Sequence, residues 1–443
     1  MPGMDFPEMD RLLALLSVPS VSARPEHAPD MARAAEMCAE EVRRAGGTAE
    51  VRVTGGHPLV VGEVPPSDGR PDAPAVLLYG HYDVQPTGPL ERWTSPPFAP
   101  EVRDGNLYAR GAADDKGNMF MLLAAVQRLA AAGDLGVRVR WLIDGEEESG
   151  GTSAVDHILA DPDAADVAVI FDSPMAAPER PTVCVGLRGS AYVRVHVRVG
   201  SADLHSGLYG GPAMNAAHVL VQVLGAVLPR DGRVSAELAA GVAPAAPAEV
   251  AAWASMPRGD EALAAAGGRP ADARAAQEFY LRTLAAPSLD VHGIQVGDPS
   301  EVKTVIPCTA EATLSLRVAP GQDAAAMLDA LAGMLEAAAP EGADVRVERV
   351  HAADAALVDQ ADPWVARAIA AIGESTGWPV TPIRLGGSLP VVAAMVARGM
   401  PTVVTGFCLP DDQFHAPDER LRVDHLEIGT RAAMAMLGSF AQP

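Results

Sequence analysis

The first part of the chain alternates short apolar runs with longer stretches of helical periodicity. Residues 76–79 are a short apolar run without helical spacing, and we interpret them as a buried strand. Residues 137–143 and 167–171 are also interpreted as strands. Residues 116–132 are apolar on nearly every face, which is typical of a helix buried against a sheet. Alternating strands and helices predict an α/β domain with a mixed, mainly parallel sheet flanked by helices.

The pattern changes after about residue 187. Residues 192–199 alternate apolar and polar positions, as a half-exposed strand does. If an Ala- and Pro-rich insertion at 234–287 is set aside, the predicted order is strand, helix, strand, strand, helix, strand, which is the ferredoxin-like arrangement. From about residue 353 the first pattern resumes. We therefore predict a main domain made of residues 1–186 and 353–443, and an inserted α+β domain of residues 187–352.

Composition supports two domains and limits the partners. The 443 residues exceed what one core usually supports, and 49% are apolar. The net charge of −23, from 57 acidic and 34 basic residues, argues against nucleic acid and anionic membranes as partners. Acidic residues precede the apolar segment 12–23, where a signal peptide would carry positive charge. The four cysteines lack paired spacing, so we expect free thiols and a cytoplasmic protein.

Potential metal ligands follow the predicted strands at their carboxyl ends. In open α/β sheets, ligands bind in the crevice beyond these ends. Two more acidic residues stand just before the buried helix. All of these side chains are expected at one edge of one sheet: His81 and Asp83, Asp114 and Asp115, Glu146 to Glu148, Asp172, and Asp411, Asp412 and His415.

Each of these features also has an ordinary structural explanation. His81 with Asp83 is more often a capped loop than a ligand pair, and His415 can cap the loop in which it lies. Three consecutive glutamates are usually a solvated helix start, where the helix dipole favours them. Asp172, before Ser173 and Pro174, can be a turn residue. Independent structural roles do not predict that all of them fall at equivalent strand ends, and this favours a shared site.

So many carboxylates in one crevice are unfavourable unless cations neutralise them, because close like charges raise one another's pKa values. Two divalent ions would relieve this repulsion. Carboxylate and imidazole ligands without thiolates suit zinc, manganese or cobalt. Two such ions bridged by one carboxylate are a recurrent site for amide hydrolysis.

The motifs of the chain resemble those of a known enzyme family. The chain is similar, from about residue 12 to its end, to the co-catalytic two-zinc metallopeptidases that include carnosinase, glutamate carboxypeptidase and succinyl-diaminopimelate desuccinylase. It looks closest to the carnosinase-like dipeptidase branch, because RGAADDKG, DLHSG and the large insertion are typical there. The motifs that carry the resemblance occur in this order: GHYDVQP, RGAADDKG, DGEEESGG, FDSP, DLHSG, KTVIP, GGS and DDQFHAPDE.

The resemblance implies a role for each residue of the predicted crevice. His81 and Asp172 would hold one metal ion, Glu148 and His415 would hold the other, and Asp114 would bridge the two. Asp83 would fix the orientation of His81 by a hydrogen bond. Glu147 would be the general base, and the peptide bond between Asp114 and Asp115 would be cis, as in similar enzymes.

The resemblance also implies roles for residues of the inserted domain, which would act as a lid and form a homodimer. His205 would reach the active site of the partner subunit, although from the residues alone it reads as a loop histidine. Arg317 and the Gly387-Ser388 loop would hold the free carboxylate of the substrate, a task that suits the planar guanidinium group. Thr304 and His351 fall where similar enzymes contact the substrate.

We therefore expect a two-metal dipeptidase, with zinc as the first choice of metal and manganese or cobalt as alternatives. It would cleave dipeptides or similar small peptides with a free C-terminal carboxylate, by a metal-bridged water that Glu147 activates. A deacylase or desuccinylase of N-acyl amino acids with the same site is the nearest alternative. If the protein were a non-catalytic, metal-binding regulatory subunit, we would expect the general base or a metal ligand to be replaced. Glu147 and all five proposed metal ligands are present. A nicotinamide-dependent enzyme lacks support, because the first βα turn has no glycine fingerprint.

Overall fold

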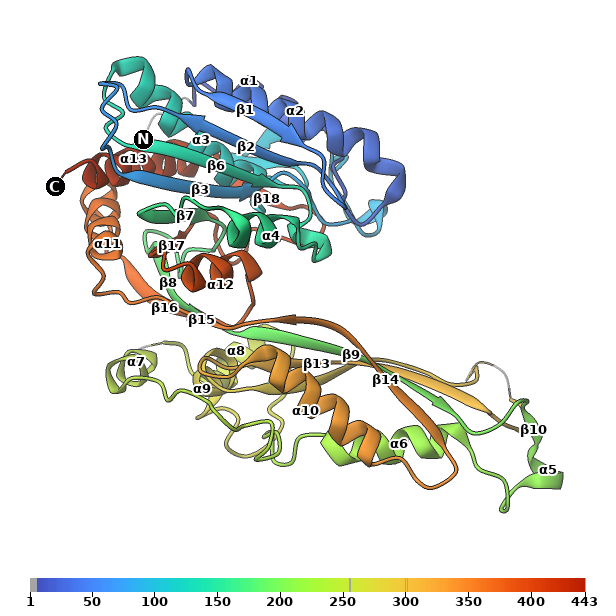
Figure 1. The fold of residues 1–443 in the computed structure, drawn as a ribbon. Coiled ribbons are helices and arrows are strands. Elements are labelled where there is room, and N and C mark those ends of the chain that lie inside the picture. The colour runs from blue at the N-terminus through green and yellow to red at the C-terminus, as the bar shows by residue number, and fades with distance from the viewer. Residues whose placement is uncertain (1–5, 255, 299, 301, 443) are drawn as a thin grey trace. The chain divides into compact units, whose positions relative to one another are not determined.

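The computed structural model describes residues 6–254, 256–298, 300 and 302–442 (Figure 1). These residues form two compact units. The first comprises the described residues up to Val185 together with Val358–Ile383 and those from Ala394 onward, and the second comprises Gly186–Leu357 and Arg384–Ala393. Whether 187–352 folds as an independent domain remains a prediction.

The first unit is built on a mixed sheet whose strands follow the order β1-β2-β6-β3-β7-β17-β8, with β16 paired to β8. The division between the units falls within β8 and β16, and β15, which follows β8 in the strand order, consists of residues of the second unit. The four central strands β6, β3, β7 and β17 are parallel, and the outer pairings that the register gives are antiparallel. The predicted mixed sheet is therefore confirmed. The strands are β1 (Thr48–Arg52), β2 (Leu59–Val64), β3 (Ala75–His81), β6 (Arg138–Asp144), β7 (Val167–Phe171), β8 (Thr182–Leu187), β15 (Ala356–Leu357), β16 (Thr381–Leu385) and β17 (Thr402–Thr405).

Helices cover the sheet of the first unit (Figure 1). Every residue of β3 is buried, as expected for a central parallel strand with both faces covered. Helix α3 is buried around most of its surface, because it packs against β3 on one side and against α13 and α1 elsewhere. The helices are α1 (Met9–Leu16), α2 (Ala28–Arg44), α3 (Lys116–Ala132), α4 (Ser153–Ala160), α11 (Pro363–Thr376) and α13 (Val423–Phe440), with 3₁₀ turns at Pro25–His27, Leu90–Arg92 and Glu147–Ser149. The division between the units falls within a further helix, α12 (Pro390–Ala397).

A small antiparallel sheet that the sequence did not predict lies in the same unit. Its strands are β4 (Glu101–Arg103), β5 (Asn106–Tyr108) and β18 (Arg420–Arg422), in the order β18-β5-β4. Arg420 pairs with Tyr108 and Arg422 with Asn106. The pairing places the segment after His415 beside the segment that leads to Asp114.

The second unit contains an antiparallel sheet of order β11-β13-β9-β14, with α6 and α10 packed against it. Alternate residues of β9, among them Val193 and Val195, are buried in its core. The strand and helix order is the ferredoxin-like one that the sequence predicted. The elements are β9 (Gly189–Arg198), β10 (Leu204–His205), α5 (Ser206–Tyr209), α6 (Ala216–Val227), α7 (Pro247–Trp253), α8 (Gly259–Ala265), α9 (Phe279–Leu284), β11 (Ser288–Gln295), β12 (Val305–Ile306), β13 (Thr309–Val318), α10 (Ala324–Ala337) and β14 (Asp344–Ala353).

None of the described helices is both long enough and apolar enough to span a membrane.

Candidate metal centre

Five segments of the first unit bring the acidic and imidazole side chains together. His81 is the last residue of β3, the turn Glu147–Ser149 follows β6, and Asp172 follows β7. His415 lies in the loop between β17 and β18, and Asp114 lies just before α3. Because β6, β3, β7 and β17 are parallel neighbours, their carboxyl ends share one edge of the sheet.

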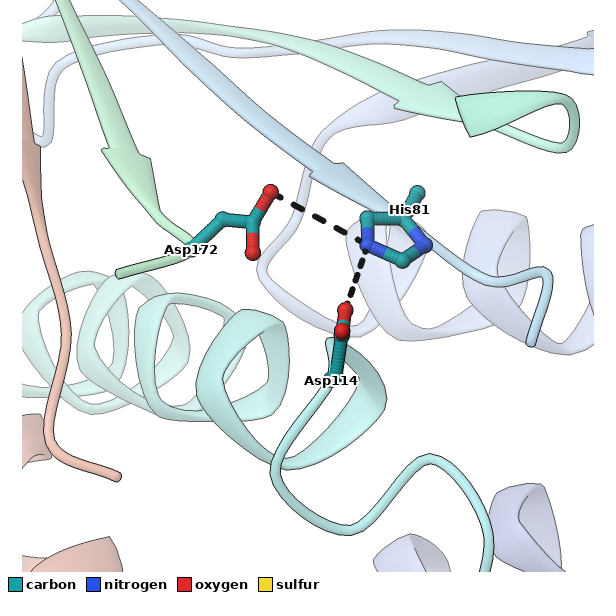
Figure 2. Close-up of side chains that lie close together, drawn as sticks. All are labelled: His81, Asp114 and Asp172. Atoms are coloured by element: carbon teal, nitrogen blue, oxygen red, sulfur yellow. Dashed lines mark hydrogen bonds and ion pairs between the residues drawn. The ribbon is translucent and has the colours of Figure 1, made fainter. Parts of the chain in front are cut away.

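His81, Asp114 and Asp172 form a first group of possible ligands (Figure 2). Nε2 of His81 lies 3.1 Å from Oδ1 of Asp114 and 4.0 Å from Oδ2 of Asp172. The His81 side chain is fully buried. Both carboxylates therefore face the same ring nitrogen of a histidine that is held inside the protein.

Asp114, Glu148 and His415 form a second group. Nε2 of His415 lies 2.9 Å from Oδ2 of Asp114 and 3.3 Å from Oε2 of Glu148. The two oxygens of Asp114 thus face different histidines, Oδ1 towards His81 and Oδ2 towards His415. The carboxylate of Asp114 stands between the two groups, and the peptide bond that follows it, to Asp115, is cis.

Burial and mutual repulsion shift the pKa values of these groups. Burial raises the pKa of Asp172 well above its usual range, and the charges of Asp114 and Asp115 raise it further. Burial also raises the pKa of Glu147 to about 7, against the opposing effect of His81. Hydrogen bonds to Asp114 and Glu148 raise the pKa of His415 to about 10. The site therefore holds more negative charge than its protein surroundings neutralise.

These residues fit divalent cations. Among the described residues, the two groups each offer three ligand atoms that lie within 4.8 Å of one another. Their donors are carboxylate oxygens and imidazole nitrogens, a set that suits zinc, manganese and cobalt. Positive ions at this place would offset the repulsion that raises the pKa of Asp172.

Asp83 contacts residues of both groups. Its backbone oxygen accepts a hydrogen bond of 3.1 Å from Nδ1 of His81, the ring nitrogen that points away from Asp114, and its Oδ1 lies 3.4 Å from the same nitrogen. Its Oδ2 accepts a hydrogen bond of 3.1 Å from the backbone N–H of Glu148. Asp83 is fully buried. Asp83 thus holds the imidazole of the first group through its backbone oxygen, and the backbone of a ligand in the second group through its carboxylate.

Gln85 is a site residue that the sequence analysis missed. Its Nε2 donates to Oε2 of Glu148 at 2.8 Å and to the backbone oxygen of Glu148 at 3.3 Å. The available signal was its place in GHYDVQP, two residues after Asp83. Gln85 and His415 therefore contact the same carboxylate oxygen of Glu148.

The other predicted site residues lie in the second unit, where they form two sets. Strand β10 pairs with β12, and Ser206 N donates to Thr304 O at 2.9 Å, so His205 and Thr304 are on adjacent segments. Nδ1 of His205 accepts from Gly207 N at 3.0 Å. The structure therefore places His205 and Thr304 near one another within this unit.

Arg317, Ser388 and His351 belong to the second set. Nη1 of Arg317 lies 3.4 Å from Oγ of Ser388, which follows Gly387. Arg317 pairs in register with Ser190 on β9, and Tyr192, two residues further along β9, is 6.4 Å from the His351 ring. Arg317, Tyr192 and His351 therefore share one face of the antiparallel sheet.

Arg188 is a second residue that the sequence analysis missed. Its guanidinium donates to the backbone oxygens of Gly386, Arg282 and Ala286. Burial, together with the charge of Arg317, lowers the pKa of Arg188 to about 10. Arg188 thus fixes the backbone just before Gly387. A single arginine before a glycine gives no sequence signal for this role.

Comparisons with known proteins agree with the resemblance in the sequence. The model of peptidase family M20/M25/M40 matches residues 77–439. Cysteinylglycine-S-conjugate dipeptidase from Corynebacterium striatum is 30% identical, over 96% of this chain and 93% of that protein. Beta-Ala-His dipeptidase from Rattus norvegicus is 28% identical, over 68% of this chain and 64% of that protein.

A solved structure of the same family is similar to this chain over its whole fold. An M20 family metallo-carboxypeptidase from Sulfolobus solfataricus matches with a TM-score of 0.88 and 25% identity. The match covers 99% of this chain and 100% of that one. The predicted resemblance to the two-zinc metallopeptidases and their carnosinase-like dipeptidase branch is confirmed by the family match and the named relatives.

Proposed function

The chain belongs to peptidase family M20/M25/M40, and from this membership we propose that it is a metal-dependent dipeptidase. It hydrolyses the amide bond of dipeptides, or of similarly small peptides, that end in a free carboxylate. The observation that carries the proposal is the position of Asp114, whose two oxygens face two separate imidazole and carboxylate groups. The names of both curated relatives describe dipeptidases, which favours dipeptides over N-acyl amino acids as substrates.

The proposal assigns two metal ions to the two groups. His81 and Asp172 would hold one ion, Glu148 and His415 would hold the other, and Asp114 would contribute to both sites. Zinc is the proposed metal, with manganese and cobalt as alternatives that the same donors accept. When bound, such ions polarise a carbonyl group and make water easier to deprotonate.

Glu147 is the proposed general base. It precedes the ligand Glu148, and burial holds its pKa at about 7, close to the value at which a carboxylate accepts and returns a proton efficiently at neutral pH. Glu147 takes the proton of the water that attacks the substrate carbonyl and passes it to the leaving amine. Asp83 keeps Nε2 of His81 directed at Asp114 by contacting the other ring nitrogen.

The second unit supplies the proposed contacts with the substrate. Arg317, with Gly387 and Ser388, holds the terminal carboxylate, and the hydrogen bond between Arg317 and Ser388 supports a shared role. Thr304 and His351 contact the rest of the substrate. We further propose that this unit acts as a lid and forms a homodimer, in which His205 of the partner subunit stabilises the oxyanion.

We also propose that the protein works in the cytoplasm. Its four cysteines are free thiols, three of them buried, which suits a reducing compartment.

A substrate panel tests the proposed function. Metal-stripped protein receives zinc, manganese or cobalt singly, and is then given mixed dipeptides, tripeptides and N-acyl amino acids. Free amino acids are detected by mass spectrometry, and the Glu147→Gln protein controls for contaminating peptidases. Metal-dependent release from dipeptides is expected. Release from N-acyl amino acids alone would replace the dipeptidase with a deacylase, and silence across the panel would refute the proposed hydrolysis.

A further inference from the structure

Glu419 lies four residues after His415 and points its carboxylate at the segment that ends in Asp114. The side chain is fully buried. Its Oε2 accepts hydrogen bonds from Arg110 Nη1 at 2.6 Å and from Gly111 N at 3.0 Å. Its Oε1 accepts from Ala113 N at 2.9 Å and from Asp114 N at 3.1 Å. Each carboxylate oxygen therefore accepts two hydrogen bonds, all from residues 110–114.

Three of these four donors are backbone N–H groups, so Glu419 determines the path of the backbone at residues 111–114. Gly111 has φ of 88°, a value that residues with a side chain rarely adopt. A Cβ there would lie 2.8 Å from Val84 and 3.2 Å from Lys116. The backbone is thus wrapped around the carboxylate as an anion-binding turn.

Arg110 completes this arrangement as the counter-charge. Its side chain is only 1% exposed. Besides Glu419, it donates to Pro86 O at 3.2 Å and lies 5.4 Å from the ring of Trp93. A buried carboxylate without a cation is costly, so Arg110 is what allows Glu419 to stay ionised among the backbone groups.

Glu419 also fixes its own segment to the same place. Its backbone oxygen accepts from Ala109 N at 3.2 Å, and the next residues form β18 beside β5. The loops that present Asp114 and His415 are therefore joined through one side chain. Since Asp114 faces both ligand groups, a displacement of residues 111–114 would alter both groups together.

We propose that Glu419, paired with Arg110, is a positioning residue that sets the affinity of both metal sites by fixing Asp114. The inference rests on the proposed function for the presence of the two ions. It predicts that loss of the Glu419 carboxylate weakens both sites, whereas loss of a ligand confined to one group weakens one. Partners that orient metal ligands typically contribute 10- to 100-fold in affinity, so a loss of about that size is expected at each site.

Cobalt binding to the full-length, metal-stripped protein tests the proposal. The variants are Glu419→Gln, which removes the charge, and Glu419→Asp, which keeps it on a shorter side chain. Affinity is measured by competition with a chelator, and ligand geometry by the visible absorption of bound Co²⁺. Thermal unfolding of each metal-free protein records stability separately.

Glu427→Gln is the matched control. Glu427 pairs with Arg128 in the same unit at 3.0 and 2.9 Å, and its side chain is also largely buried. This variant should lose stability and keep the cobalt affinity and spectrum of the parent. Glu419→Gln should lose affinity at both sites with a changed spectrum, and Glu419→Asp should recover part of it.

The outcomes separate this inference from the proposed function. A parent protein that binds no Co²⁺ would refute the two-metal function, and the inference with it. A parent that binds two ions, with folded Glu419 variants of unchanged affinity and spectrum, would overturn the inference alone. Failure of both Glu419 variants to fold would also overturn it, because the residue would then serve the fold and not the metal sites.

Discussion

Lys116, the residue after Asp115, offers a test of the buried polar contacts around the candidate site. Its side chain is fully buried, and Nζ donates to Leu15 O at 3.1 Å and to Val18 O at 2.8 Å. The amine thus binds carbonyl groups at the carboxyl end of α1, where a positive charge is favourable. Burial lowers the pKa of Lys116 from 10.5 to about 8.

The size of the effect follows from this shift. Between pH 8 and 10.5 the folded chain has lost the proton that the unfolded chain still holds, so the stability that Lys116 contributes rises with pH. Integrating the proton-binding difference from pH 7 to 9.5 gives about 2 kcal/mol in favour of the folded state. Methionine has no titratable proton, so the free energy of unfolding of Lys116→Met lacks this pH-dependent contribution.

Urea unfolding of the metal-stripped proteins, followed by circular dichroism at pH 7, 8.5 and 9.5, measures this difference. The stability of the parent relative to Lys116→Met should increase by about 2 kcal/mol across the range. Lys303, the other lysine of the chain, is exposed, and Lys303→Met is the matched control for replacing a lysine by methionine outside the buried site. A difference for Lys116→Met that stays flat or falls with pH would refute the reasoning.

Glu147→Gln should lower turnover by about 10²- to 10⁴-fold and still bind metal, since it removes a proton acceptor and no ligand; normal turnover would remove the base assignment. Stripping the metal should lower the unfolding temperature, because an ion at one hundred times its Kd adds about 2.7 kcal/mol; calorimetry showing no change would contradict the metal assignment. Arg317→Lys should raise KM more than it lowers kcat, because lysine lacks the planar guanidinium group that binds a carboxylate at two points. Steady-state kinetics with dipeptides measures both constants, and a loss of kcat with unchanged KM would contradict the assignment. His205→Ala should slow the reaction without weakening metal binding, and mixing it with Glu147→Gln subunits should restore activity in mixed dimers. Confirmed mixed dimers without activity would count against a role across the dimer.

The parallel sheet and the edge that carries the candidate site could be predicted because both depend on local pattern. Apolar runs such as 76–79 mark buried strands, and the residue after each run falls at the carboxyl end by geometry alone. The pattern did not divide the ligands between two ions or distinguish Glu147 from Glu148. Those roles depended on the resemblance, and they stay predictions.

The supporting residues could not be predicted, because their partners are distant in sequence. Arg110 and Glu419 are 309 positions apart, and neither has a pattern that distinguishes it from a surface charge. Gln85 reaches Glu148 across 63 positions. The strands β4, β5 and β18 have three residues each, too few to show a period. Such contacts appear only when the chain has folded.

The hydrolysis of one dipeptide, followed while zinc is added stepwise to the metal-stripped protein, examines the two-metal dipeptidase directly. Bound zinc is measured in the same samples. Activity should be absent without metal and reach its maximum when two ions are bound per chain, because Asp114 faces two groups of ligands. Full activity in the metal-free protein, or two bound ions without hydrolysis of any dipeptide, would contradict this account.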